Sequence, residues 1–290
     1  MSAGIDTHWA RRKLDRARVH LAELQRVSGA WLEPTTYPLD VVLADDGRRL
    51  ELVLAFAEPP PLEEWALVVG DCIHNIRTAL DVFIWANSEM LSENERERVA
   101  YPILQRDDDP DADPDADLLE DLPSDRRRWV KQNLAGLPRP LRSQVLKNIR
   151  WASLPVGDHF VRHQRLPLIA ELDKIDKHRL ALDLVASTSI ATWNVRAWGP
   201  GGEEVPVDLD YSGPDLGTAT IRNGRVVMGT GTPSGPIART QGDAWVTLNL
   251  RVRVPVPTTK DPTSMNVLAW LGHFIEDVDG LLDVLGAPGP

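Results

Sequence analysis

The stretch from Gly70 to Asp81 carries the residue types best suited to chemistry in this chain. If it forms a helix, at 100° per residue, an apolar stripe lies on one side and short polar side chains lie on the other. The polar side holds Asp71, His74, Asn75, Thr78 and Asp81, with Arg77 at its edge. A solvated helix face usually carries long Lys and Glu side chains. This composition therefore indicates either a buried polar network or a binding site.

A second polar cluster, Glu-Leu-Asp-Lys-Ile-Asp-Lys-His-Arg, occupies residues 171–179. Its basic end suits a helix C-terminus, because the helix dipole favours cations there. The cluster adds four candidate pocket residues to those of the 70–81 cluster: Asp176, Lys177, His178 and Arg179. We expect the two clusters either to line one pocket or to bond to each other and fix the register of their helices.

The patterns of metal and cofactor sites are weak or missing. His159 and His163 are four residues apart, a spacing that puts two imidazoles on one helical face, which makes them weak metal-ligand candidates. The glycine-rich stretches lack the strand-to-helix context and the Lys-Ser/Thr ending of phosphate-binding loops, so no cofactor is expected. The lone Cys72 excludes an intramolecular disulfide and a Cys-rich zinc site.

The net charge of −11 is concentrated in one segment. Residues 107–125 hold ten acidic residues and no Lys or Arg, whereas residues 126–150 hold eight basic residues and no acid. The Asp-Pro-Asp-Ala repeat at 109–117 predicts a flexible acidic loop, because it has no apolar surface to bury. A calcium loop of the EF-hand type is disfavoured because the sixth position lacks glycine.

Periodicity predicts an α+β fold. Helical spacing appears at residues 5–31, 62–90, 118–135, 140–152, 167–179 and 265–285, and a hairpin is expected at 37–57. Residues 182–254 alternate apolar and polar side chains, which is typical of an antiparallel sheet, and Asn223-Gly224 suggests a tight hairpin there. We expect a mainly helical domain at 1–179, with the hairpin and a flexible acidic loop at 106–125, and a sheet domain at 180–290 whose last helix packs on the bundle.

A cytoplasmic protein without a membrane partner is expected. No run of about 18 uncharged apolar residues occurs, and residues 1–12 lack the apolar segment of a secretion signal.

Three segments together resemble a widespread family of uncharacterised bacterial proteins. They are Gly70-Asp-x-x-His-Asn-x-Arg-x-Ala-Leu-Asp81, Tyr101-Pro-Ile and Leu172-x-x-Ile-Asp-Lys-His-Arg179. The resemblance covers roughly residues 60–180. The family's Arg-x4-His pattern is similar to that of HEPN helical domains, in which Arg and His form an RNA-cleaving pair in dimers. Arg77 matches the Arg, but Val82 stands where the His would be, so the resemblance implies a degenerate module.

Three functions follow as hypotheses. The first is a catalytically degenerate HEPN-like module, acting in bacterial stress or defence, that binds RNA or a protein partner through residues 126–150 and Arg77, as a homodimer. The second is a small-molecule-binding protein, or an enzyme of unknown class, with its pocket at the two polar clusters. The third is a structural or oligomeric protein in which the same residues form a buried network.

The charge pattern predicts an effect of deleting residues 107–121. If the acidic segment shields the basic one, its deletion increases the affinity of the chain for polyanions steeply, and added salt removes the gain because the interaction is electrostatic. Retention on immobilised heparin at several salt concentrations measures this. Equal retention of the deleted and full chains would contradict the shielding hypothesis.

Overall fold

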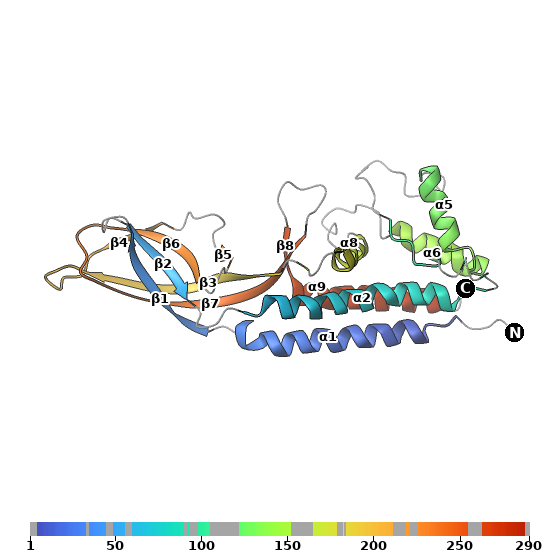
Figure 1. Cartoon of the computed structure of the whole chain (residues 1–290), viewed down its shortest axis with the longest axis horizontal. Coiled ribbons are helices and arrows are strands. Elements are labelled where there is room, and N and C mark those ends of the chain that lie inside the picture. The colour runs from blue at the N-terminus through green and yellow to red at the C-terminus, as the bar shows by residue number, and fades with distance from the viewer. Residues whose placement is uncertain are drawn as a thin grey trace. The chain divides into compact units, whose positions relative to one another are not determined.

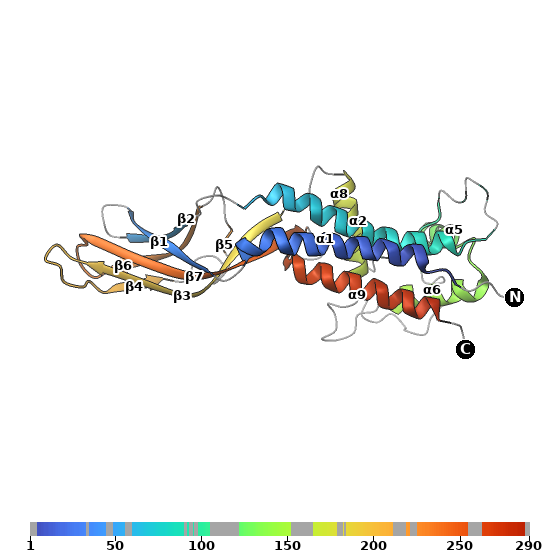
Figure 2. The same ribbon diagram turned by 90° about the horizontal axis from the view of Figure 1, so that it is seen from below.

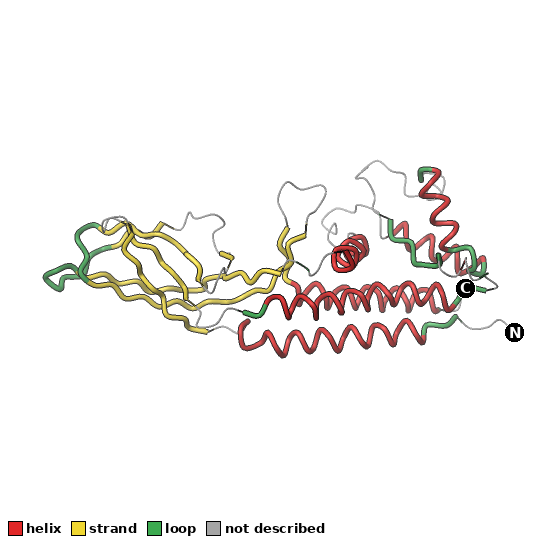
Figure 3. The backbone as a smooth tube through the Cα atoms, viewed as in Figure 1, coloured by secondary structure: helices red, strands yellow, loops and turns green. Residues whose placement is uncertain are grey.

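The chain forms two compact units, one helical and one built around a sheet. The computed structural model describes residues 5–32, 35–44, 49–55, 60–89, 92, 95, 98–104, 122–151, 165–178, 182, 184–210, 219–220, 225–254 and 263–287. The helical unit comprises Met1–Glu23, Leu67–Leu182 and Leu268–Pro290, and the sheet unit comprises Leu24–Ala66 and Asp183–Val267. The helices and strands, coloured separately in Figure 3, confirm the expected α+β class.

The helices lie close to the predicted positions. They are α1 (His8–Leu32), α2 (Leu62–Ala86), α5 (Ser124–Asn133), α6 (Arg139–Trp151), α8 (Arg165–His178) and α9 (Val267–Gly286). In the helical unit, α1, α2 and α9 run side by side and α8 crosses them, as Figures 1 and 2 both show. Over the described ranges, no helix joins enough length to enough apolar character to cross a bilayer.

The core of the helical unit comes from the apolar stripes of these helices. Fully or almost fully buried side chains include Leu14, Ala17, Ile73, Ile76, Leu80, Phe83, Leu271, Phe274, Val278 and Leu282. The spacing of three and four residues in each set puts its members on one helix face, so hydrophobic burial draws α1, α2 and α9 together.

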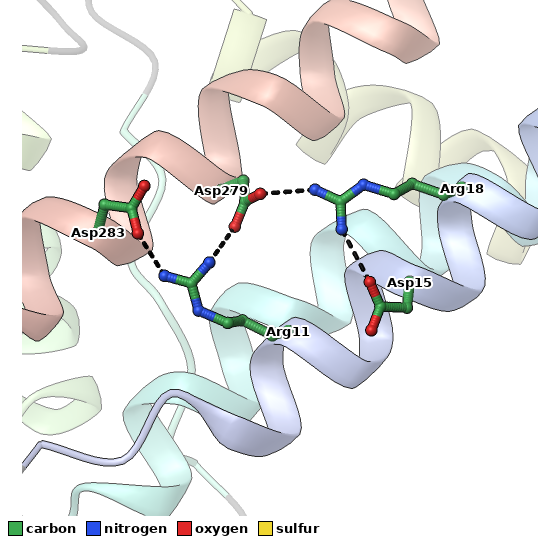
Figure 4. Close-up of polar contacts among 5 residues, drawn as sticks. All are labelled: Arg11, Asp15, Arg18, Asp279 and Asp283. Carbon is green, nitrogen blue, oxygen red and sulfur yellow. Dashed lines mark hydrogen bonds and ion pairs between the residues drawn. The ribbon is translucent and has the colours of Figure 1, made fainter.

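A chain of alternating charges runs along the α1–α9 seam (Figure 4). Asp279 accepts hydrogen bonds from Arg11 at 2.5 Å and from Arg18 at 2.6 Å, and Arg11 also pairs with Asp283. Arg18 continues the chain to Asp15 at 2.9 Å. Because Asp279 is largely shielded from solvent, its two pairs are screened less by salt than fully exposed pairs are. They tie the last helix to the first across the length of the sequence.

The sheet unit contains an eight-stranded antiparallel sheet. Its strands are β1 (Thr35–Ala44), β2 (Arg49–Ala55), β3 (Leu184–Trp198), β4 (Val207–Asp210), β5 (Ala219–Thr220), β6 (Arg225–Pro233), β7 (Arg239–Val254) and β8 (Thr263–Asn266). They follow the order β4-β6-β2-β1-β7-β3-β5, with β8 paired to β7. Buried Leu50, Leu52, Leu250 and Val252 contribute to its core.

The hairpin β1–β2 belongs to this sheet rather than to the helical domain expected from its position in the sequence. Leu39 faces Leu54 within the hairpin, Thr35 faces Val246 of β7, and Leu50 faces Gly231 of β6. An isolated two-stranded hairpin is marginally stable, and pairing both of its edges satisfies its backbone groups.

One local expectation for the sheet is corrected and another is untested. Strand β3 carries a bulge between Ile190 and Thr192, which shifts the alternation of its side chains. The hairpin expected at Asn223-Gly224 lies outside the described residues and stays a prediction. The residues expected to begin the last helix form β8, because Met265 pairs with Val252.

Candidate functional site

The 70–81 cluster lies in the middle of α2, on a helix whose other face is fixed in the core. Val69, Cys72, Ile76 and Ala79 are fully buried. The Cys72 thiol donates a hydrogen bond to the Ala17 carbonyl of α1 at 3.3 Å, and burial raises its pKa to about 12. A thiol with this pKa is almost entirely protonated at neutral pH, so Cys72 is a packing residue and a poor nucleophile.

The two polar clusters meet through His74 of α2 and Asp173 of α8. His74 Nδ1 lies 3.2 Å from Asp173 Oδ1, and the other carboxylate oxygen accepts a 2.6 Å hydrogen bond from Lys177 Nζ. Asp173 is buried, whereas the side chains of His74 and Lys177 are 47% and 48% exposed. A buried carboxylate thus joins two helices while its partners stay open to solvent.

This contact determines the orientation of the imidazole. An ionised Asp173 only accepts hydrogen bonds, so a neutral His74 carries its proton on Nδ1 and keeps a lone pair on Nε2. Nε2 lies 3.4 Å from the Thr78 hydroxyl, one helical turn further on. Hydroxyl, imidazole and carboxylate therefore follow one another in the order found in general-base catalysis, at a longer hydroxyl distance than in a short hydrogen bond.

Close packing of α8 on α2 depends on Gly70. A Cβ added there would lie 2.3 Å from Asp176 Oδ1, a distance that real Cβ atoms do not adopt. Partial desolvation raises the pKa of Asp176, and the nearby carboxylates of Asp173 and Asp71 add to this. Asn75 uses its amide group to donate to the Asp71 carbonyl at 2.8 Å, which is a contact within α2 itself.

Arg77 and Asp81 hold the Tyr101 backbone from both sides, an arrangement that we call the Tyr101 clamp. Arg77 Nη2 donates to the Tyr101 carbonyl at 3.0 Å and pairs with Asp81 Oδ1 at 3.0 Å, and the Tyr101 amide donates to Asp81 at 2.9 Å. The Arg77 side chain is only 13% exposed. Residues of the 70–81 cluster therefore contact both other segments that carry the family resemblance.

The clamp places charge in a largely desolvated position. Burial raises the pKa of Asp81, although Arg77 and the Tyr101 amide oppose the rise by favouring its charged form. Burial also raises the pKa of the Tyr101 hydroxyl, which stays protonated. Among the described residues, Arg77 Nη1 and this hydroxyl have no hydrogen-bond partner. Unmade hydrogen bonds of buried groups reduce the net stability that the clamp supplies.

The predicted pocket residues do not all gather in one place. His74, Thr78, Asp176 and Lys177 gather with Asp71 near Asp173, Asn75 is bonded within α2, and Arg77 and Asp81 belong to the Tyr101 clamp. His178 is the last residue of α8, and Arg179, His159 and His163 lie outside the described residues. Within the described ranges, no group of three or more His, Cys, Asp or Glu side chains is arranged to hold a metal ion.

Asp173 belongs to the second cluster but was not singled out among its candidate residues, and Tyr101 was not a candidate. Both Asp173 and Asp176 face α2, and helical spacing alone does not decide which of the two carboxylates meets His74. Tyr101 binds Arg77 and Asp81 through its backbone carbonyl and amide, and a pattern of side-chain types cannot predict backbone contacts of this kind. The Tyr101-Pro-Ile segment of the family resemblance was the available signal for it.

A second polar surface lies on α5, the first helix of the basic segment. One of its faces carries Ser124, Arg127, Arg128, Lys131 and Gln132, which together with Ala135 just after the helix line a shallow, open groove of about 400 Å³. We call it the cationic face. Ser124, Arg127 or Arg128, and Lys131 follow one another at intervals of three or four residues, so they form one helical stripe. Val130 and Asn133, on the other side of α5, are buried.

Some basic residues of 126–150 serve the local fold instead. Arg142 of α6 donates to the carbonyls of Ala135 and Leu137, at 2.8 and 3.1 Å, and so holds the turn between α5 and α6. Arg127 donates to the Leu122 carbonyl at 3.1 Å. Arg128 and Lys131 are exposed and form no ion pair with a residue that the structure describes.

Comparison with protein-family models, curated proteins and solved structures finds no match to this chain.

The contact at Gly70 predicts an unusual response to Gly70→Ala. Alanine in place of glycine inside an ordinary helix adds up to about 1 kcal/mol of stability. At Gly70 we expect this gain to be cancelled or turned into a loss of up to about 1 kcal/mol in the free energy of unfolding, because the Asp176 carboxylate must move away from the added methyl group. Chemical denaturation measures both quantities.

Gly280→Ala in α9 is the matched control, since a Cβ there meets nothing within 4 Å. This control should gain stability, and Asp176→Ala combined with Gly70→Ala should recover most of the loss. A gain for Gly70→Ala equal to that of Gly280→Ala would show that α8 does not press on α2 at this position.

Proposed function

We propose that the chain binds RNA through the cationic face of α5 and does not use Arg77 to cleave it. The single observation that carries the proposal is the pair of cations Arg128 and Lys131, which lie one helical turn apart on that face and are both exposed to solvent. Phosphates bind to exposed Arg and Lys side chains because the contact releases condensed counterions. The absence of acid from residues 126–150 supports the same assignment.

The proposal differs from the HEPN-like hypothesis in the residues that touch RNA. Arg77 is mostly buried, and it is occupied by the Tyr101 carbonyl and Asp81. A guanidinium with these partners supports the fold of the helical unit, and Val82 supplies no acid or base. These contacts therefore support RNA binding in which Arg77 and Val82 do not act as a cleaving pair.

Charge reversal on α5 tests the proposal. Arg128→Glu with Lys131→Glu removes two phosphate contacts, so the plot of log affinity against log salt should lose about 1.4 units of slope for single-stranded RNA. Binding of a labelled 20-nucleotide RNA, measured by fluorescence anisotropy from 50 to 300 mM salt, gives the slope. The RNA should also be recovered intact after incubation with the full chain.

Arg12→Glu with Arg16→Glu on α1 is the control, because both residues are exposed and the change in net charge is the same. This pair should leave the salt slope unaltered. An equal loss in both double variants would mean that only net charge matters, and no loss in either would refute RNA binding by α5.

A second candidate function, acid–base chemistry on a small polar substrate, is favoured by the orientation of His74. Its Nδ1 is held by Asp173, and its Nε2 is directed at the Thr78 hydroxyl on a half-exposed side chain. A base oriented in this way accepts a proton from a hydroxyl or a water molecule. This site would be formed by α2 and α8 and would share no residue with the cationic face of α5.

Hydrolysis of p-nitrophenyl acetate tests this second candidate. His74→Gln and Asp173→Asn should each lower the rate of the chain several-fold, because one removes the base and the other removes its orientation. His273→Gln is the matched control, since His273 is also half-exposed and lies 3.5 Å from the carboxylate of Glu276. Equal small losses at His74 and His273 would assign the activity to surface imidazoles in general.

A further inference from the structure

Two carboxylates close to the oriented His74 base have no ionic partner in the described part of the chain. Asp71 is exposed and precedes His74 by three residues on α2, and Asp176 of α8 lies against α2 at a point four residues before His74. Neither side chain forms an ion pair with a described residue. Asp173 differs from both, because each of its oxygens already accepts a hydrogen bond.

Negative charge outweighs positive charge around the His74 imidazole. The charged groups that act on Asp176 are Asp173, Asp71, His74 and Lys177. Partial desolvation and the two other carboxylates raise the pKa of Asp176, whereas a protonated His74 and Lys177 oppose the rise. While the imidazole is neutral, three carboxylates are therefore set against one ammonium. Such surroundings attract a cation more strongly than a neutral group of the same size.

The spacing along α2 sets the distance between a bound cation and the base. Asp71 and the point where Asp176 meets α2 lie three and four residues before His74. At 1.5 Å per residue this is about 4.5–6 Å along the helix axis. An alkyl chain of a few carbon atoms spans that length, so one small molecule can reach both the carboxylates and the imidazole.

We propose that the His74 site acts on small esters that carry a primary ammonium group a few carbon atoms from the acyl carbon, with Asp71 and Asp176 binding the ammonium. The proposal rests on the acid–base function described above for His74 and adds the class of substrate. A primary ammonium donates three hydrogen bonds, and an ionised carboxylate only accepts them. Asp71 and Asp176 thus select the substrate, and His74 acts on it.

The reaction at this site is hydrolysis of the ester. His74 Nε2 accepts a proton from a water molecule while the water oxygen bonds to the acyl carbon. The bond between the acyl carbon and the leaving sulfur or oxygen then breaks, and the leaving group takes the proton from Nε2. The products are a carboxylic acid and a thiol or an alcohol, and His74 returns to its neutral form.

The test compares the thiobenzyl esters of Nα-acetyl-lysine and Nα-acetyl-norleucine, which differ in the ammonium group of the side chain. For the full chain at low salt, kcat/KM divided by the rate with free imidazole should be about 3- to 10-fold higher for the lysine ester. Each carboxylate contributes about 3-fold at a separation near 6 Å in water. Raising the salt to 300 mM should reduce the preference, because salt screens exposed charges.

Asp71→Asn with Asp176→Asn should remove the preference and leave the rate of the norleucine ester unchanged. Both substitutions keep the size of the side chain, so thermal unfolding should not change. Glu63→Gln with Glu64→Gln is the matched control, because these two exposed carboxylates lie on the same helix, about 15 Å before His74. The inference is overturned if the full chain shows no preference, if the asparagine variant keeps it, or if the control loses it equally.

The substrate class and the acid–base function fail in different ways. NMR titration of the His74 imidazole with Nα-acetyl-lysine methylamide reports binding without turnover. If His74→Gln does not slow hydrolysis, but the amide shifts the imidazole signals of the full chain and not those of the asparagine variant, cation binding stands and catalysis is refuted. If His74→Gln slows both esters equally and neither is preferred, the base stands and the substrate class is refuted.

Discussion

The pairing of the charged groups of α2 is the constraint on which the helical unit depends. The Arg77 side chain is only 13% exposed, and leaving a charge unpaired in such a position is strongly destabilising, whereas its partner Asp81 is 32% exposed. Their partners are each other and the Tyr101 backbone, so the segment after α2 must return to α2 for the helix to keep these residues. His74 adds a second fixed point by binding the buried carboxylate of Asp173 on α8. The apolar stripe of α2 supplies most of the buried surface. The hydrogen bonds of Arg77, Asp81 and His74 determine how the Tyr101 segment and α8 are aligned along α2.

The polar residues that support the fold are different from those that are open to a ligand. Arg77, which matches the Arg of the HEPN-like pattern, donates a hydrogen bond to the Tyr101 carbonyl. The open polar groups are elsewhere: the imidazole of His74 above its buried carboxylate, and Arg128 and Lys131 on α5. Arg128 and Lys131 form no ion pair with a residue in the described part of the chain, so the proposed RNA contact is assigned to α5 rather than to the 70–81 cluster.

Sequence patterns predicted that the 70–81 and 171–179 clusters carry the unusual chemistry, and His74 and Asp173 do join them. The pattern puts Arg77 at the edge of the polar side of the helix, but it does not show that Arg77 is held in the Tyr101 clamp while His74 is half-exposed. The pattern also does not decide whether Asp173 or Asp176 meets His74. That pairing depends on how α8 crosses α2, where Gly70 leaves room for the Asp176 carboxylate.

The sequence by itself determined the α+β class, the helices of the described ranges to within a few residues and the hairpin at 35–55. These features follow from periodicity and turn chemistry, which depend on residues at most a few positions apart. Only the tertiary structure decided that the hairpin joins β6 and β7, that Asp279 bonds Arg11 and Arg18, and that Arg77 is buried. These pairings connect residues far apart in the sequence. For each of these residues, many other residues in the chain have the same local pattern and could serve as its partner. The actual partner is selected because the whole fold must bury its apolar side chains and bond its polar groups at the same time.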